Sequence, residues 1–514
     1  MAQAVQEFGE IERKYEMPDR VGFPPLAGLP GVASAGEPEE ETLEAVYFDT
    51  ADLDLARAGV TLRRRAGGAD EGWHLKLPVG PDERRELRAP LRRPGSGADE
   101  VPGELAQLVT VHTRGGELSP VAHVRTTRTR RLLRDEAGEV LAEVVDDRVS
   151  GQTVGDRTTV SSWREVEVEL SGGGRKLFGA VEKRLASAGA RPARNTAKLE
   201  RVLEDRWPAD PGERWRRPRP KSRAGEVVMA YVAEQVATIK AYDPRVRRDE
   251  PDSVHKMRVA TRRLRSALQA YGRLIDRDAT RGLSGELKWL ATVLGAERDT
   301  EVMADRLAGM VAATDDDLVL GPVAARVTDT FAGRRARTHA DVLETLDGAR
   351  YLALLDALDA LVDHPPLTRR ARRRARAALP REVARTHRRV ARRAATAAAR
   401  SGPARDVALH ETRKAAKRAR YAAEAATPVY GKQARRYAKG MKKVQELLGE
   451  HQDGVTLRQV LRQLGAQAHL AGENGFTFGL LHEREGVAGE RSAGRFPKAW
   501  QRAGRPRRRR WQRT

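Results

Sequence analysis

The segment EIERKYE, residues 10–16, holds the first side chains in the sequence that could do chemistry. In a β-strand every second residue shares a face, so Glu10, Glu12 and Lys14 would point one way and the residues between them the other. The segment EVEVE, residues 165–169, repeats this acidic alternation. Carboxylates so crowded repel one another unless cations lie between them. Because their hard oxygens are suitable ligands for Mg²⁺ or Mn²⁺, the pattern predicts a divalent metal site.

Basic residues recur at the same two-residue spacing in other strand-like segments, namely Arg63 and Arg65, Lys76, Arg84 and Arg88, and Arg128 and Arg130. Arg and Lys side chains suit phosphate oxygens. One charged strand face usually meets solvent. About six such strands with apolar backs instead predict a closed barrel with a polar lumen, because helices can then cover the apolar exterior. That lumen would hold a metal-bound oligophosphate.

The pattern leaves two assignments open. The segment VRTTRTRRLL offers Arg125, Arg128, Arg130 and Arg131, and the strand register decides which of them face inward, because a shift by one residue exchanges the faces. The segment DERRELRAP likewise allows Arg84 or Arg85. We favour Arg84, because its two-residue spacing from Glu86 and four-residue spacing from Arg88 would place all three on one strand face.

These segments resemble the CYTH, or triphosphate tunnel metalloenzyme, superfamily, whose opening signature Glu-x-Glu-x-Lys is EIERK here. The resemblance covers residues 7–204 and continues through YFDT, LRRR, LKLP, RRELR, EVVDD, EVEVEL and NTAKLE. It implies a tunnel of about eight antiparallel strands. It also implies phosphoanhydride hydrolysis with Mg²⁺ or Mn²⁺, in which a bound metal lowers the pKa of an attacking water.

The resemblance also implies residue roles. Those assigned to catalysis are Glu10, Glu12 and Lys14. Those assigned to the metal are Glu10, Glu12, Glu165 and Glu167, with Asp147 and Glu169 in support. Those assigned to the triphosphate are Arg63, Arg65, Lys76, Arg84, Arg128, Arg130 and Lys198, with Lys14 also binding phosphate.

The second half of the chain contains an internal repeat. HKMRVATRRLRSAL from His255 is similar to HETRKAAKRARYAA from His410, and Asp299 and Asp453 follow the two copies at nearly the same offset. On a helix the polar residues of each copy form one stripe. The two stripes are His255, Arg258, Arg262 and Arg265, and His410, Arg413, Lys417 and Arg420. A single basic helix face is often merely solvated, but its recurrence predicts a paired surface for an extended polyanion.

This half resembles the CHAD, or conserved histidine α-helical, domain, over about residues 222–505. The resemblance implies two related helical bundles and binding of inorganic polyphosphate. By match to its motif, the polyphosphate-binding residues are the eight members of the two stripes.

Charge is distributed unevenly along the 514 residues. Residues 1–204 carry 30 Lys and Arg against 35 Asp and Glu, whereas residues 205–514 carry 65 against 37. So large a basic excess indicates a polyanionic partner. The absence of cysteine excludes disulfides and thiolate chemistry. No uncharged run approaches the ~18 residues that span a bilayer, so we expect no membrane partner and a cytoplasmic protein, associated with polyphosphate granules in one interpretation.

The predicted fold class is α+β and multidomain: an antiparallel eight-stranded β-tunnel with late helices, then an all-α domain of two related helical bundles. We expect the tunnel domain over 1–206, a linker over 207–221, the helical domain over 222–505 and a basic tail over 506–514. Helices are predicted over 226–245, 253–275, 283–310 and 406–426.

Three classes of function fit these features. The first is an inorganic triphosphatase whose helical domain recruits polyphosphate. The second is a non-catalytic polyphosphate-binding or granule-associated protein, because binding and turnover use the same residues. Within the first class, thiamine triphosphate hydrolysis or ATP cyclisation is an alternative. The third is a nucleic-acid binder, which we favour less because only 5% of the residues are aromatic, leaving few stacking platforms.

Overall fold

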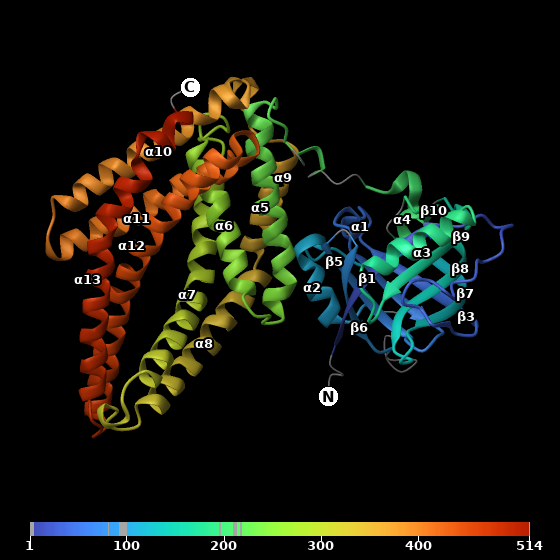
Figure 1. The fold of residues 1–514 in the computed structure, drawn as a ribbon, viewed down its shortest axis with the longest axis horizontal. Coiled ribbons are helices and arrows are strands. Elements are labelled where there is room, and N and C mark those ends of the chain that lie inside the picture. The colour runs from blue at the N-terminus through green and yellow to red at the C-terminus, as the bar shows by residue number, and fades with distance from the viewer. Residues whose placement is uncertain are drawn as a thin grey trace. The chain divides into compact units, whose positions relative to one another are not determined.

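The chain divides into two compact units, Met1–Asp210 and Pro211–Thr514 (Figure 1). The computed structural model describes residues 5–80, 82–91, 100–155, 157–194, 197–208, 213–215 and 218–512, apart from the side chains of Asp205 and Glu213. The predicted linker 207–221 and basic tail 506–514 each include residues outside these ranges. Their limits therefore stay predictions.

The described part of the first unit contains ten strands, and eight of them form a closed antiparallel barrel. Around the barrel they follow the order β1 (Gln6–Glu16), β6 (Glu83–Ala89), β5 (Gly72–Gly80), β4 (Thr61–Ala66), β3 (Glu39–Asp49), β7 (Ser119–Arg134), β8 (Val140–Thr153) and β9 (Val160–Leu170). The short strands β2 (Ser34–Ala35) and β10 (Arg191–Pro192) pair with β7 and β1. The predicted eight-stranded tunnel is confirmed.

Strand β1 closes the barrel by dividing its length between two neighbours. Residues 6–11 pair with β6, whereas residues 12–16 pair with β9. Glu12 lies opposite Glu169, and Lys14 lies opposite Glu167. This register brings the two acidic segments of the sequence together on the inner wall.

Helices cover the apolar outer faces of the strands, as the alternating pattern predicts. Helix α3 (Lys176–Ser187) buries Phe178 and Val181 in one cluster with Val144 and Val166 of the barrel. Helix α2 (Gly103–Thr113) packs on another face with Leu62, Leu75 and Leu87. The predicted late helices are present as α3 and α4 (Lys198–Leu203), whereas α1 (Asp54–Arg57) and α2, which precede β7, were not predicted. Helix α4 follows β10.

The secondary structure of the second unit, within its described residues, is helical apart from two isolated β-bridges. Its helices are α5 (Ala224–Arg247), α6 (Ser253–Ala270), α7 (Arg281–Ala312), α8 (Val323–Asp347), α9 (Ala349–Asp363), α10 (Ala375–Ala398), α11 (Gly402–Ala425), α12 (Thr427–Leu470), α13 (Phe476–Gly504) and α14 (Pro506–Arg509). Figure 1 shows α7 and α8 as one long hairpin and α12 and α13 as another. The predicted helix over 253–275 ends early, at Ala270, and the chain after it pairs Ile275 with Leu367 while the amide of Asp276 donates to the carbonyl of Pro366. The predicted all-α domain is otherwise confirmed.

The two hairpins share an apolar core. It joins Leu307 of α7 and Phe331 of α8 to Leu461 of α12 and Phe478 of α13. No helix among the described residues is long and apolar enough to cross a membrane.

Candidate functional site

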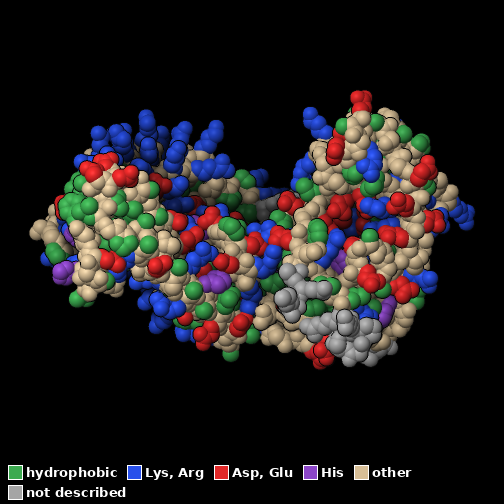
Figure 2. All heavy atoms as spheres, turned by 90° about the horizontal axis from the view of Figure 1, so that it is seen from below, with side chains coloured by type: hydrophobic (Ala, Val, Ile, Leu, Met, Phe, Trp, Pro, Cys, Tyr) green, Lys and Arg blue, Asp and Glu red, His purple; other side chains and the backbone are tan. Residues whose placement is uncertain are grey.

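The barrel encloses a cavity of about 310 Å³ whose wall is almost entirely charged. Figure 2 shows acidic and basic side chains interspersed on the barrel unit. Most of the sequence-predicted residues line this cavity: Glu10, Glu12, Lys14, Arg63, Arg65, Lys76, Arg84, Arg128, Arg130, Glu167, Glu169 and Lys198. Asp147 and Glu165 lie behind this lining, within reach of Lys198.

The structure resolves the two assignments that the sequence left open. Arg84 lines the cavity, whereas Arg85 forms an ion pair with Glu7 at 2.9 Å and is not part of the lining. Arg128 and Arg130 also face inward. Arg131 lies over the ring of Phe23, 4.5 Å from its centroid.

Lys198, the first residue of α4, contacts three carboxylates at once. Its Nζ lies 2.8 Å from Asp147, 2.7 Å from Glu165 and 2.7 Å from Glu167. Burial alone would lower the pKa of Lys198, but these carboxylates outweigh burial and hold the pKa well above its usual value. Oxygens of the three acids lie within 4.8 Å of one another, as metal ligands would. In this structure, however, a cation already neutralises them.

Two further cations reinforce this part of the wall, which we call the cationic zone (Lys14, Arg128 and Lys198). Arg128 donates to both oxygens of Asp147 at 2.8 Å. Lys14 donates to Glu167, the residue opposite it in the sheet. The pKa of Glu167 lies well below its usual value, because Lys14 and Lys198 outweigh its burial.

Glu10, Glu12 and Glu169 form a second region, the carboxylate zone. Lys76 bonds both oxygens of Glu10, at 2.7 and 2.9 Å, yet burial still raises the pKa of Glu10. Burial and the neighbouring Glu10 and Glu12 raise the pKa of Glu169 to about 7. Only Glu12 has a lowered pKa, since Lys14 and Lys76 outweigh its burial. The raised pKa values of Glu10 and Glu169 indicate that neighbouring cations do not offset their burial, and such carboxylate oxygens suit Mg²⁺ or Mn²⁺.

Glu86 was predicted to share a strand face with Arg84 and Arg88, but no role was predicted for it. This residue is fully buried, accepts from Arg88 at 2.6 Å, and lies 2.8 Å from Nδ1 of His74. Lys76 and His74 outweigh its burial and hold the pKa of Glu86 far below its usual value. Burial lowers the pKa of His74 to about 3, so this imidazole is neutral. Glu86 thus fixes basic side chains on the wall, a role that its alternation with Arg84 and Arg88 could have suggested.

Arg63 and Arg65 lie on the same inward face of β4. Arg63 lies 3.5 Å from the hydroxyl of Tyr47, and Arg65 pairs with Asp70. Burial and the neighbouring Arg63 lower the pKa of Arg65 to about 9. Arg130 bonds Glu143 at 2.8 Å, and Arg84 lies 3.8 Å from Glu12. Arg65 is thus a wall cation that its surroundings disfavour, whereas Tyr47 and Glu86 outweigh burial and raise the pKa of Arg63.

In the helical unit the two predicted stripes lie on α6 and α11, which pack against each other. All eight side chains are half-buried. Arg258 pairs with Asp299 at 2.9 Å, and Arg413 makes the equivalent pair with Asp453 at 3.4 Å. Figure 2 shows Lys and Arg side chains gathered along one edge of this unit.

Lys417 carries the strongest sign that the stripes meet. Burial, followed by Arg262 and Arg413, lowers its pKa to about 6. Arg262 belongs to α6 and Arg413 to α11, so cations of both stripes act on one ammonium group. The pKa of Arg262 is also lowered, by burial and by neighbouring arginines. We call Arg258, Arg262, Arg413 and Lys417 the paired basic surface.

The outer members of the stripes differ between the two halves. Arg420 is neutralised by Glu424 at 2.7 Å, whereas the pKa of Arg265 is lowered by burial alone. Burial and nearby cations lower the pKa of both His255 and His410. These histidines are therefore uncharged at neutral pH.

Two glycines were missed by the sequence analysis. A Cβ on Gly295 would lie 3.1 Å from the guanidinium of Arg258, and one on Gly449 would lie 3.0 Å from that of Arg413. Each arginine thus lies flat on the neighbouring helix at a position without a side chain. The recurrence of Leu-Gly in LGAERD and LGEHQD was the signal that could have revealed them.

Comparison with known proteins gives matches to two family models. Residues 9–194 match the CYTH domain and residues 230–462 match the CHAD domain. Two uncharacterized proteins from strains of Mycobacterium tuberculosis are each 39% identical over 500 residues, covering 94% of this chain and 94% of their own length.

Solved structures are less similar in sequence. PptA from Streptomyces chartreusis is 23% identical with a TM-score of 0.46, covering 55% of this chain and 100% of its own. The CHAD domain from the plant Ricinus communis is 24% identical with a TM-score of 0.40, covering 58% and 94%. A putative adenylyl cyclase from Hippeastrum, described as having a dominant triphosphatase activity, is 17% identical with a TM-score of 0.26, covering 38% and 96%.

Proposed function

Because the chain belongs to the family of proteins in which a CYTH domain precedes a CHAD domain, we propose that it hydrolyses inorganic triphosphate in its tunnel and binds inorganic polyphosphate on its helices. The observation that carries the first half is the division of the cavity wall into a carboxylate zone and a set of inward-facing cations. Hydrolysis of a phosphoanhydride needs both.

In this proposal Glu10, Glu12 and Glu169 hold the divalent ion, Mg²⁺ or Mn²⁺. When bound, the ion would neutralise phosphate oxygens and lower the pKa of the attacking water. Lys76, which bonds Glu10 in this structure, would contact a phosphate oxygen when Glu10 holds the ion. Asp147 and Glu165 act mainly by holding Lys198, because its ammonium group already contacts both.

The inward-facing cations orient the phosphate chain. Arg63, Arg65, Arg84 and Arg130 line the cavity together with the cationic zone. They stabilise negative charge on the transferred phosphoryl group, and their positions are fixed in advance by carboxylates such as Glu86 and Glu143.

The test is phosphate release by the full-length protein from inorganic triphosphate, thiamine triphosphate, ATP and long-chain polyphosphate, with and without Mg²⁺ or Mn²⁺. Metal-dependent release from inorganic triphosphate, lost in Glu10→Gln, supports the proposal. Arg84→Gln should raise KM for triphosphate, whereas Arg85→Gln, its outward-facing neighbour, serves as the matched control. Triphosphate binding without release from any substrate would favour a non-catalytic polyphosphate-binding protein.

The second half of the proposal rests on the packing of α6 against α11, which brings cations of both stripes close enough that burial, Arg262 and Arg413 lower the pKa of Lys417 to about 6. A polyphosphate chain would supply the missing anions. Replacing the paired basic surface by alanine should abolish most polyphosphate affinity and leave triphosphate turnover intact. A control removes equal charge from the basic run near α10: Arg369, Arg370, Arg372 and Arg373. Competition with DNA distinguishes polyphosphate from nucleic acid, and imaging of a fluorescent fusion tests association with cytoplasmic polyphosphate granules.

A further inference from the structure

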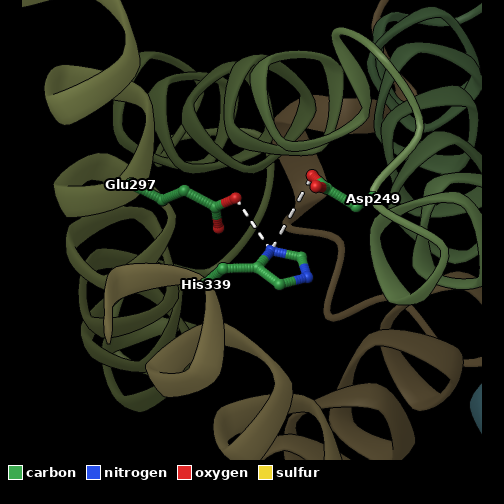
Figure 3. A group of neighbouring side chains, drawn as sticks. All are labelled: Asp249, Glu297 and His339. Atoms are coloured by element: carbon green, nitrogen blue, oxygen red, sulfur yellow. Dashed lines mark hydrogen bonds and ion pairs between the residues drawn. The ribbon is translucent and has the colours of Figure 1, made fainter. Parts of the chain in front are cut away.

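Asp249, Glu297 and His339 converge in the first half of the helical unit (Figure 3). Glu297 comes from α7, His339 from α8 and Asp249 from the connection between α5 and α6. The Nδ1 atom of His339 lies 3.0 Å from a carboxylate oxygen of Glu297 and 4.0 Å from one of Asp249. One ligand atom from each residue lies within 4.8 Å of the other two.

The hydrogen bonds of this group are incomplete. A single N–H on the imidazole can fully satisfy only one of the two carboxylates that face it. Glu297 is only 5% exposed, and its Oε2 has no hydrogen-bond partner among the described residues. Burial also raises the pKa of Glu297. A buried carboxylate oxygen without a partner is costly, and a cation would relieve that cost.

We propose that Asp249, Glu297 and His339 bind a divalent transition-metal ion of the Zn²⁺ class. Two carboxylates and one imidazole are ligands that Zn²⁺ accepts, with water completing the coordination. The imidazole distinguishes this site from the tunnel, whose ligands are all oxygens and suit Mg²⁺ or Mn²⁺. The ion would join α7, α8 and the α5–α6 connection at one point.

Arg335 competes with the metal for Asp249. Its Nη2 lies 2.9 and 3.2 Å from the two oxygens of Asp249. The side chain of Arg335 is 56% exposed, so it can turn into solvent when a metal arrives. Removing Arg335 should therefore strengthen metal binding. If the cluster were only a set of ion pairs, removing Arg335 would not strengthen metal binding.

The second half of the unit offers an internal control, the cluster of Asp406, His451 and Glu490. Both ring nitrogens of His451 already have an oxygen within hydrogen-bond distance: Asp406 lies 2.9 Å from Nε2 and the carbonyl of Gly489 lies 3.2 Å from Nδ1. Glu490 pairs with Arg405 at 3.0 Å. Among the described residues, no side-chain atom of this second cluster is buried without a hydrogen-bond partner, in contrast to Oε2 of Glu297, so we assign the metal to the first cluster alone.

The test is titration of chelator-treated full-length protein with Co²⁺, followed by the visible absorption of the ion, in buffer with excess Mg²⁺ to occupy oxygen-only sites. Wild type should give a saturable signal that Zn²⁺ displaces. Asp249→Asn and His339→Gln should bind at least about tenfold more weakly. Arg335→Gln should bind several-fold more tightly, and His451→Gln should match wild type.

Asp249 is half-exposed, so Asp249→Asn remains informative even if His339→Gln does not fold. A wild-type titration curve for Asp249→Asn overturns the proposal. Weaker Co²⁺ binding by Arg335→Gln, or loss of the signal in His451→Gln, overturns it as well.

Discussion

Lys417 should make polyphosphate binding strongly dependent on pH. In the free protein burial, Arg262, Arg413 and Arg258 lower its pKa to about 6, against the opposite effect of Asp453. The side chain is therefore uncharged above this pH. A phosphate chain beside it favours the charged form, so binding should take up about one proton.

The size of the effect follows from proton linkage. Between the pKa of the free lysine and its higher pKa in the complex, each pH unit should weaken binding about tenfold, equivalent to ~1.4 kcal/mol. From about pH 7 to pH 8 Lys417 contributes to this slope. The pKa values of His255 and His410 are lowered in the free protein, and any proton that they take up on binding would remain in a variant that lacks Lys417.

The assay is calorimetric titration of full-length protein with long-chain polyphosphate at constant ionic strength and several pH values. Two buffers of different ionisation enthalpy report the proton uptake directly. Lys417→Arg keeps its charge and should flatten the slope. Lys414→Arg, on the exposed side of the same helix, should keep it. A wild-type affinity that is constant over this interval, or an unchanged slope in Lys417→Arg, would refute the reasoning.

Three other predictions concern single residues. Because the pKa of Glu169 is raised to about 7, protons compete with metal below that pH. The Mn²⁺ concentration for half-maximal phosphate release should therefore fall as pH rises through 7. This trend should be absent in Glu169→Gln. If the variant keeps the wild-type trend, Glu169 is not a metal ligand. Lys198→Ala removes the cation that contacts three carboxylates and should lower the free energy of unfolding by about 3–5 kcal/mol. Denaturant unfolding and hydrogen exchange in β8 and β9 measure this loss. A decrease below ~1 kcal/mol would show that these carboxylates do not need Lys198. Gly449→Ala should increase the stability of its helix by about 0.5–1 kcal/mol. It should also weaken polyphosphate binding several-fold, because the new Cβ displaces the guanidinium of Arg413. Equal polyphosphate affinity of variant and wild type by titration would show that the position of Arg413 is unimportant.

The inward faces of the tunnel strands could be predicted from the sequence, because strand parity is local. Once Glu10 and Glu12 share a face, any closed barrel directs both to the same side. Arg63 and Arg65 follow the same rule. The sequence could not show that Glu12 lies opposite Glu169, because that depends on which strands are neighbours and on their register.

Partners that come from outside a strand were harder to predict. The ammonium of Lys198 reaches the wall from a helix, so strand periodicity carries no information about which carboxylates it neutralises. The choice between Arg84 and Arg85 depended on parity alone and agrees with the direction of Arg84 in the structure. Helix α2 was missed because no motif marked it. The three-residue cluster around His339 joins segments about 90 residues apart, beyond the reach of any local pattern.

The shared pairing of β1 has a consequence for synthesis of the protein. Its second half pairs with β9, roughly 150 residues further along the chain, so the barrel cannot close on the ribosome until β9 has emerged. Until then β6 can already pair with residues 6–11 of β1, but residues 12–16 lack their partner, and the growing chain exposes open strand edges that can pair with other chains. An N-terminal truncation that removes β1 would make this state permanent. We therefore expect a truncated chain to aggregate, although it loses only a few per cent of its residues.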